Sequence, residues 1–214
     1  MSELERRFTP VPVELRVAND RKRIGGYASV FNSSSRNLGG FVEQVAPGFF
    51  NDSRSRGWPD VVARYNHDDN MVLGTTGSGT LSLALDSTGL LYDVDPPKGR
   101  ADVLELVERG DIRTSSFAFQ TLEDEWTQTD QGFPQRMLMT GILVDVAPVV
   151  SAAYPDATAG LRSLARAMNA PIEDVQALAK DNELRKFFVR TDGPQAPAPK
   201  LSIVDARALI AKRL

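Results

Sequence analysis

Short runs of alternating apolar and polar residues dominate the chain from Val11 to about Val150. A period of two residues is typical of β-strands with one buried face, and it is clear for Val13, Leu15 and Val17. The same kind of reasoning predicts strands over residues 24–31, 41–45, 60–65, 81–85, 90–94, 112–120 and 136–149. The turn residues at 86–89 predict a hairpin between the two leucine-containing strands that flank them.

Helical signals are few in this region. Residues 101–109 have Val103, Leu104 and Val107 on one helical face, and Gly110 follows as a cap. Residues 46–50 contain a proline near the start of a short predicted helix. Many short strands with few helices predict a mainly β fold with some α (α+β). We expect a partly closed β-barrel, because closure removes exposed strand edges.

The pattern changes after Ala159, and four regions are predicted. Residues 1–159 form the barrel domain, and 160–190 form a helical segment with helices near 161–168 and 172–189. Residues 191–200 form a proline-rich linker. Residues 201–214 form a short amphipathic C-terminal helix that docks on the barrel or on a partner. Acidic residues outnumber basic ones up to residue 159, whereas basic residues are in excess beyond it.

Composition excludes several kinds of site. The 214 residues include no Cys and one His, so disulfides, thiolate metal sites and a cysteine nucleophile are excluded. No apolar run approaches the roughly 20 residues that cross a bilayer, and the N-terminus lacks the shape of a signal peptide. The net charge is −3, which gives no global attraction to nucleic acid. We expect a protein of the cytosol with no membrane and no nucleic-acid partner.

His67, the single imidazole, follows a predicted strand in the polar segment 66–70. A lone His in such a loop is more often an ordinary surface residue than a general base or a metal ligand. Asp68 and Asp69 offer carboxylates to a hard cation, but the spacing of a calcium loop is absent. We therefore expect neither a metal nor a cofactor.

Ser116 is the candidate nucleophile on the strand that begins near residue 112. Alternation places Ser115, Phe117 and Phe119 on one face of this strand. If the two phenylalanines point into the core, Ser116 lies on the opposite face beside the small Ala118, which leaves room for a substrate. Two serines in a strand are also common without any function.

Asp145 is the single charge in the apolar stretch 141–150. A buried carboxylate needs partners, and orienting an imidazole would provide one; an outward position on an edge strand is the equal alternative. Ser116, His67 and Asp145 supply a nucleophile, a base and an orienting group. The chain order His, Ser, Asp differs from those of the well-known triads, and no GxSxG elbow surrounds the serines.

Several segments, in order, resemble motifs of the prohead proteases of tailed bacteriophages, which are distant relatives of the herpesvirus assemblins. The resemblance spans residues from about 24 to 156. The matching segments are 24–31 (IGGYASVF), 41–50 (FVEQVAPGFF), 66–68 (NHD) with 73–74 (LG), 89–90 (GL), 110–119 (GDIRTSSFAF), 141–147 (GILVDVA) and 153–155 (AYP). Their number, order and spacing carry the resemblance.

The resemblance implies a serine endopeptidase with Ser116 as nucleophile and His67 as base. Asp145 takes the place of the family's usual Glu and is shorter by one methylene. Three other positions also depart from the family pattern: Ser115 replaces Met, Ala118 replaces Gly and Ala147 replaces Ser. A second histidine, as in the herpesvirus triad, is impossible within this chain.

The resemblance further implies a role in capsid maturation inside the procapsid, in the host cytoplasm. Expected partners are the major capsid protein and a scaffold protein or scaffolding segment, which the enzyme would cleave together with its own tail; a homodimer is a further possibility. The alternative is a non-catalytic scaffold or assembly protein with a protease-like barrel. An esterase acting on small molecules ranks last, because no elbow or apolar pocket signature is present.

Overall fold

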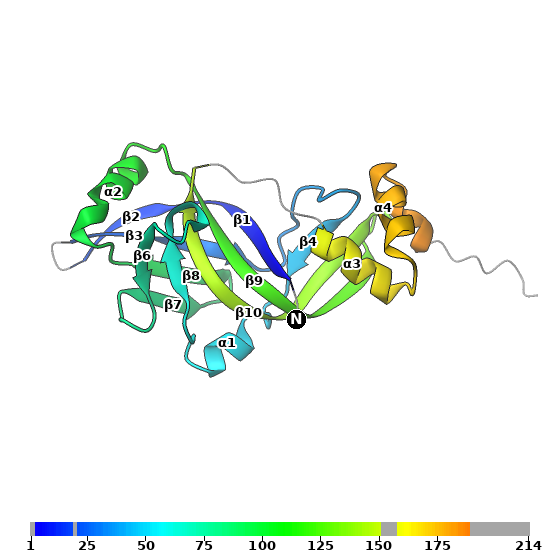
Figure 1. Cartoon of the computed structure of the whole chain (residues 1–214), viewed down its shortest axis with the longest axis horizontal. Helices are drawn as coiled ribbons and strands as arrows, with labels where there is room; N and C mark the ends of the chain where they lie inside the picture. Colours follow the sequence, from blue (N-terminus) through cyan, green and yellow to red (C-terminus); the bar gives the residue numbers. More distant parts are fainter. Residues whose placement is uncertain (1–2, 19–20, 151–157, 189–214) are drawn as a thin grey trace, which may run out of the picture.

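The computed structural model describes residues 3–18, 21–150 and 158–188. Ten strands form two sheets in this part of the chain (Figure 1). The strands are β1 (Leu4–Pro12), β2 (Glu14–Ala18), β3 (Arg21–Val30), β4 (Val42–Val45), β5 (Val62–Arg64), β6 (Val72–Thr75), β7 (Leu81–Leu85), β8 (Gly89–Val94), β9 (Thr114–Gln128) and β10 (Pro134–Val149). The helices are α1 (Asn51–Ser55), α2 (Ala101–Glu108), α3 (Thr158–Ala167) and α4 (Ile172–Lys180), with short 3-10 turns η1 (Tyr65–His67), η2 (Lys98–Arg100) and η3 (Leu184–Phe187).

The larger sheet has six strands. Five of them follow the order β1-β9-β10-β5-β6, and the sixth, β4, pairs with the N-terminal part of β10 at residues 135–138. The smaller sheet has the order β2-β3-β8-β7. Apolar side chains from both sheets form one buried core, which includes Ile24, Leu90, Tyr92, Phe117, Phe119 and Val146. The two sheets therefore pack against each other through side chains.

The mixed α+β class is confirmed, whereas the partly closed barrel is not. Within the described residues, neither ladder of hydrogen bonds returns to its own first strand. The chain passes from the larger sheet to the smaller one at Val13, between β1 and β2. Edges are thus left at β1 and β6 in one sheet and at β2 and β7 in the other.

Several elements differ from the sequence prediction. Strand β1 was not predicted, because its buried side chains Glu5, Arg7 and Thr9 are polar. The first helix begins at Asn51 rather than within 46–50. The helix predicted over 172–189 ends at Lys180, because Asn182 has a left-handed φ of 57°. The predicted linker and C-terminal helix lie outside the described residues.

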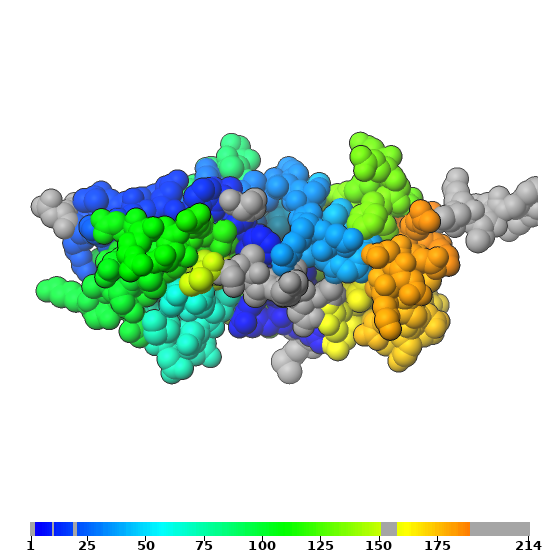
Figure 2. All heavy atoms as spheres, turned by 90° about the horizontal axis from the view of Figure 1, so that it is seen from above, coloured from blue at the N-terminus to red at the C-terminus, as the bar shows by residue number. Residues whose placement is uncertain are grey.

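Helices α3 and α4 share an apolar cluster with Trp126 on β9 and with Phe41, which precedes β4. Phe41 and Trp126 meet edge to face with ring centroids 5.0 Å apart, and both belong to the apolar cluster under these helices. Trp126 donates from Nε1 to the Ser163 hydroxyl on α3. The two helices occupy one end of the molecule and α2 the other (Figures 1 and 2). No helix in the described ranges is long and apolar enough to cross a membrane.

Gly89, the first residue of β8, is required by a close approach between strands. It pairs with Val30, and an added Cβ would collide with the Ser29 carbonyl oxygen. We expect Gly89→Ala to lower the free energy of unfolding by about 1–3 kcal/mol, because the strands must move apart. A urea titration measures this value. Gly99→Ala, where a Cβ meets nothing within 4 Å, is the matched control and should be close to neutral.

Candidate active site

His67 lies at the end of β5, in the turn η1. Asn66 and His67 both adopt left-handed backbone angles, with φ of 54° and 57°. The Asn66 side chain holds this turn, because its Oδ1 accepts a hydrogen bond of 3.0 Å from the Val150 amide at the end of β10. Left-handed non-glycine residues are costly and persist where the surroundings hold them. The turn therefore directs the imidazole over the larger sheet.

Ser116 faces the imidazole because of its register on β9. Phe117 and Phe119 stack in the core, with centroids 4.9 Å apart. Ser115 lies on their side, and its hydroxyl is 2.9 Å from the Tyr92 hydroxyl. Burial raises the pKa of Tyr92 strongly, so this phenol stays neutral. Ser116 projects from the opposite face, as alternation predicted.

Asp145 reaches the same face through an irregularity in β10. Leu143 pairs with Phe119 and Val146 pairs with Phe117, so both belong to the core face. The register shifts between Leu143 and Asp145, and Asp145 then pairs with Ala118. A bulge of this kind inserts one extra residue and reverses the alternation beyond it. Without it, Asp145 would share the core face with Leu143.

The structure brings the three predicted residues together. His67 Nδ1 lies 2.6 Å from Asp145 Oδ1, and His67 Nε2 lies 2.7 Å from Ser116 Oγ. A carboxylate only accepts hydrogen bonds, so Nδ1 carries the imidazole hydrogen and donates it to Asp145. Nε2 is then free to accept the hydroxyl hydrogen of Ser116. The shorter Asp side chain is sufficient to make this contact.

Two further groups contact these three residues, and the sequence did not identify either. Arg64 Nη1 donates to Asp145 Oδ2 at 2.7 Å, and Arg64 Nε lies 3.1 Å from the exposed Asp69. Asp145 thus uses one oxygen for His67 and the other for Arg64. The Ser116 hydroxyl also lies 2.8 Å from the Arg7 carbonyl oxygen on β1. One hydroxyl hydrogen is therefore shared by two acceptors, His67 Nε2 and this carbonyl.

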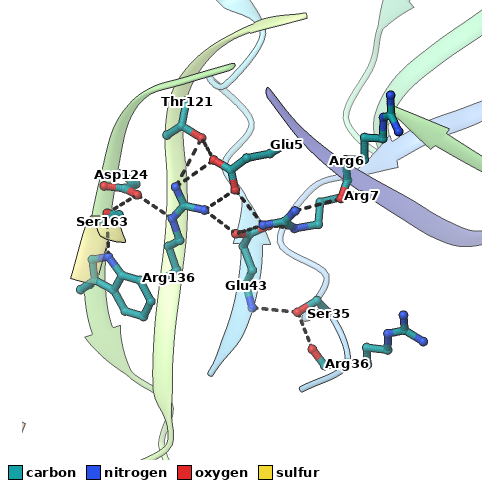
Figure 3. Close-up of polar contacts among 11 residues, drawn as sticks. Glu5, Arg6, Arg7, Ser35, Arg36, Glu43, Thr121, Asp124, Arg136 and Ser163 are labelled. Atoms are coloured by element: carbon teal, nitrogen blue, oxygen red, sulfur yellow. Dashed lines mark hydrogen bonds and ion pairs between the residues drawn. The ribbon is translucent and has the colours of Figure 1, made fainter. Parts of the chain in front are cut away.

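A buried network of charges lies beside the site, formed by side chains of β1, β9, β10 and β4. Figure 3 shows the carboxylates of Glu5 and Glu43 between the guanidinium groups of Arg7 and Arg136. Arg7 donates to Glu43 at 2.7 Å, and Arg136 donates to Glu5 and Glu43 at 2.7 Å and 2.9 Å. Asp124 also accepts from Arg136, at 2.5 Å. Burial alone would raise the pKa of Glu5, but hydrogen bonding and charge from Arg136, with the charge of Arg7, leave it lowered.

One of the comparisons with known proteins identifies a family for this chain. The family model of the caudovirus prohead serine protease matches residues 10–170, which include His67, Ser116 and Asp145. Searches of curated proteins and of solved structures gave no match. The matched region covers most of the chain, including helix α3 and every strand except most of β1. The chain therefore belongs to the caudovirus prohead serine protease family.

Proposed function

We propose that the chain is a serine endopeptidase of procapsid maturation, with Ser116, His67 and Asp145 as its triad. The observation that carries this proposal is the contact of one imidazole with both Ser116 Oγ and Asp145 Oδ1. Membership of the prohead serine protease family supports the same activity. The substrate is a scaffold protein or the scaffolding segment of the capsid protein, cleaved inside the assembling shell in the host cytoplasm.

The geometry supports a two-step acyl transfer. Ser116 Oγ attacks the scissile carbonyl carbon, and its proton passes to His67 Nε2. Asp145 stabilises the imidazolium through Nδ1, while Arg64 holds the second carboxylate oxygen in place. The proton then goes to the leaving amine, which leaves an acyl ester on Ser116. Water then attacks the carbonyl carbon of this ester and gives a proton to His67 Nε2. His67 returns that proton to Ser116 Oγ as the ester bond breaks, and the new carboxyl end is released.

Co-expression with the major capsid protein and scaffold of the same phage tests the function. Wild-type chain should shorten the capsid or scaffold band, and Ser116→Ala should not. Ser115→Ala is the matched control, because Ser115 lies on the core face beside Tyr92, and this variant should still cleave. Identical bands with wild type and Ser116→Ala would support the alternative of a non-catalytic assembly protein.

Self-cleavage of the basic tail beyond about residue 160 is part of the proposal. The charge difference between the two parts of the chain motivates it, because a basic tail would suit incorporation into the shell. Intact-mass measurement of wild type should show a shorter chain than that of Ser116→Ala. Equal masses after assembly would rule out this trimming.

Arg64 should act as a positioning residue. We expect Arg64→Met to lower kcat about 10- to 100-fold, because Asp145 and the imidazole it orients lose their fixed geometry. KM should change little, since Arg64 is placed to contact Asp145 rather than substrate. Arg64→Lys should recover part of the rate. Steady-state kinetics with a cleaved peptide measures both constants, and an equal rise in KM would contradict the positioning role.

A further inference from the structure

Strand β1 lies directly along the nucleophile strand. It forms the outer edge of the larger sheet and pairs antiparallel with β9, with Phe8 opposite Ser116 and Arg7 opposite Phe117. The other neighbour of β9 is β10, which carries Asp145 and cannot leave without dismantling the triad. The edge occupied by β1 is therefore the one place where a second extended chain can lie against the nucleophile strand.

The contact between β1 and Ser116 is not that of a substrate about to be cleaved. The Arg7 carbonyl presents its oxygen to Ser116 Oγ at 2.8 Å, so that oxygen is hydrogen-bonded to the hydroxyl. In an attack geometry the carbonyl carbon faces the nucleophile, and separate donors bind the oxygen. The contact also competes with His67 Nε2 for the hydroxyl hydrogen. β1 thus blocks the nucleophile rather than reacting with it.

The part of β1 that covers Ser116 lies outside the region shared with the family. The family model begins at residue 10, whereas Glu5, Arg7 and Phe8 precede it. Strands β9 and β10, which carry Ser116 and Asp145, lie within the matched region, and so does His67. The blocking segment therefore lies just before the matched region.

Paired charges hold β1 at this edge. Glu43 on β4 accepts two hydrogen bonds from the Arg7 guanidinium, at 2.7 Å and 3.0 Å. Arg136 on β10 donates to Glu5 at 2.7 Å and 3.1 Å. Glu5 and Arg7 are two residues apart and share one face of the strand. The sheet therefore offers a carboxylate and a guanidinium that fit an acidic and a basic residue in an acidic-x-basic segment.

A cavity of about 400 Å³ runs beside β1 and gives room for the side chains of a bound strand. Arg7, Phe8 and Thr9 line it from the strand, with Phe117 of β9. The segment 33–36 and Glu43 line it from the other elements. The Arg36 guanidinium lies over the Phe8 ring, 4.9 Å from its centroid.

We propose that the outer edge of β9 is the binding site for an extended peptide substrate of acidic-x-basic pattern, and that β1 fills this site as an intramolecular inhibitor. Glu43 and Arg136 are the specificity-determining residues. The substrate pairs with β9 in place of β1, with its scissile carbonyl carbon rather than a carbonyl oxygen turned toward Ser116 Oγ. This inference rests on the proposed protease function.

Labelling of the full-length chain with a fluorophosphonate tests the inhibition. We expect Arg7→Gln to raise the labelling rate of Ser116 about 10-fold or more, because the state with an open edge becomes more populated. Phe8→Ala, which removes the stacking with Arg36 and keeps the buried charges, should raise it less. Arg16→Gln is the matched control. Arg16 pairs with Glu14 on the solvent-exposed strand β2, so this variant should leave the labelling rate unchanged. Unchanged labelling in both folded β1 variants would overturn the proposal.

A peptide of the β1 sequence, LERRFTPVP, tests the binding site itself. A fluorescent form should bind the full-length Arg7→Gln, Ser116→Ala chain by anisotropy, and unlabelled peptide should slow labelling of the Arg7→Gln chain. Replacing the peptide's second Arg by Gln should weaken binding about 10-fold or more, since a charged hydrogen-bonded pair is lost. Equal binding of the two peptides, or no binding, would overturn the proposal. Binding does not require catalysis, so an unreactive Ser116 with a normal peptide affinity would count against the protease function alone.

Discussion

Replacing His67 by Gln is expected to lower the rate of peptide cleavage by about 1,000-fold or more. His67 is the single imidazole of the chain, and no other histidine exists to replace it as base. Gln preserves a polar side chain at the site, but it cannot take the Ser116 proton. Single-turnover kinetics with a fluorogenic peptide measures the loss.

The fold of this variant should be close to that of the wild type. His67 occupies a turn that the Asn66 side chain holds through the Val150 amide, and that bond is untouched. A melting curve and the fluorophosphonate reaction separate a loss of chemistry from a loss of folding. A folded His67→Gln chain that cleaves at more than a tenth of the wild-type rate would show that the base lies elsewhere.

Replacing Arg136 by Met is expected to lower the free energy of unfolding by about 3–5 kcal/mol. The Arg136 side chain is 2% exposed and pairs with Glu5, Glu43 and Asp124. Met fills much of the same volume, but the carboxylates around it lose their shared partner. Buried charges without partners cost far more than an exposed ion pair contributes. Urea unfolding at neutral pH measures the loss.

The loss of stability caused by Arg136→Met should depend on pH in a definite direction. The folded-state pKa of Glu5 is lowered, so its contribution to stability is present above the unfolded-state pKa, near 4.3. It is lost as the pH falls through the folded-state value. The difference between wild type and Arg136→Met should therefore narrow as the carboxylates become protonated. Arg109→Met, at an exposed pair, is the control and should change stability by less than about 0.5 kcal/mol at any pH.

The sequence carried much of the site but not all of it. Alternation placed Ser116 on the face opposite Phe117 and Phe119, because that stretch of β9 is regular. It left the orientation of Asp145 open, because a register shift cannot be read from the order of apolar residues. Arg64 was missed, since a charged residue at a strand end is ordinarily solvated. Only the fold shows that it contacts Asp145.

The buried network was missed for a related reason. Glu5, Arg7 and Thr9 alternate with a period of two, but the buried face of this strand is the polar one. Apolar residues are ordinarily expected on the buried face of a strand, so the pattern of this strand would predict that its polar face is exposed. Its partners Glu43 and Arg136 lie far along the chain, so no local spacing indicates the pairing. The closure of a barrel was equally beyond pattern analysis, because strand order depends on distant pairings.

The irregularity at Val144 has a consequence for how such a site changes over evolution. The side that Asp145 faces is determined by counting residues along β10 as much as by the identity of the residue itself. Exchange of Asp for Glu alters the reach of the carboxylate by one methylene and leaves it on the same face of the strand. Loss or gain of a single codon between Leu143 and Asp145 would turn the carboxylate into the core. During evolution, this part of β10 should therefore tolerate substitutions more readily than insertions or deletions.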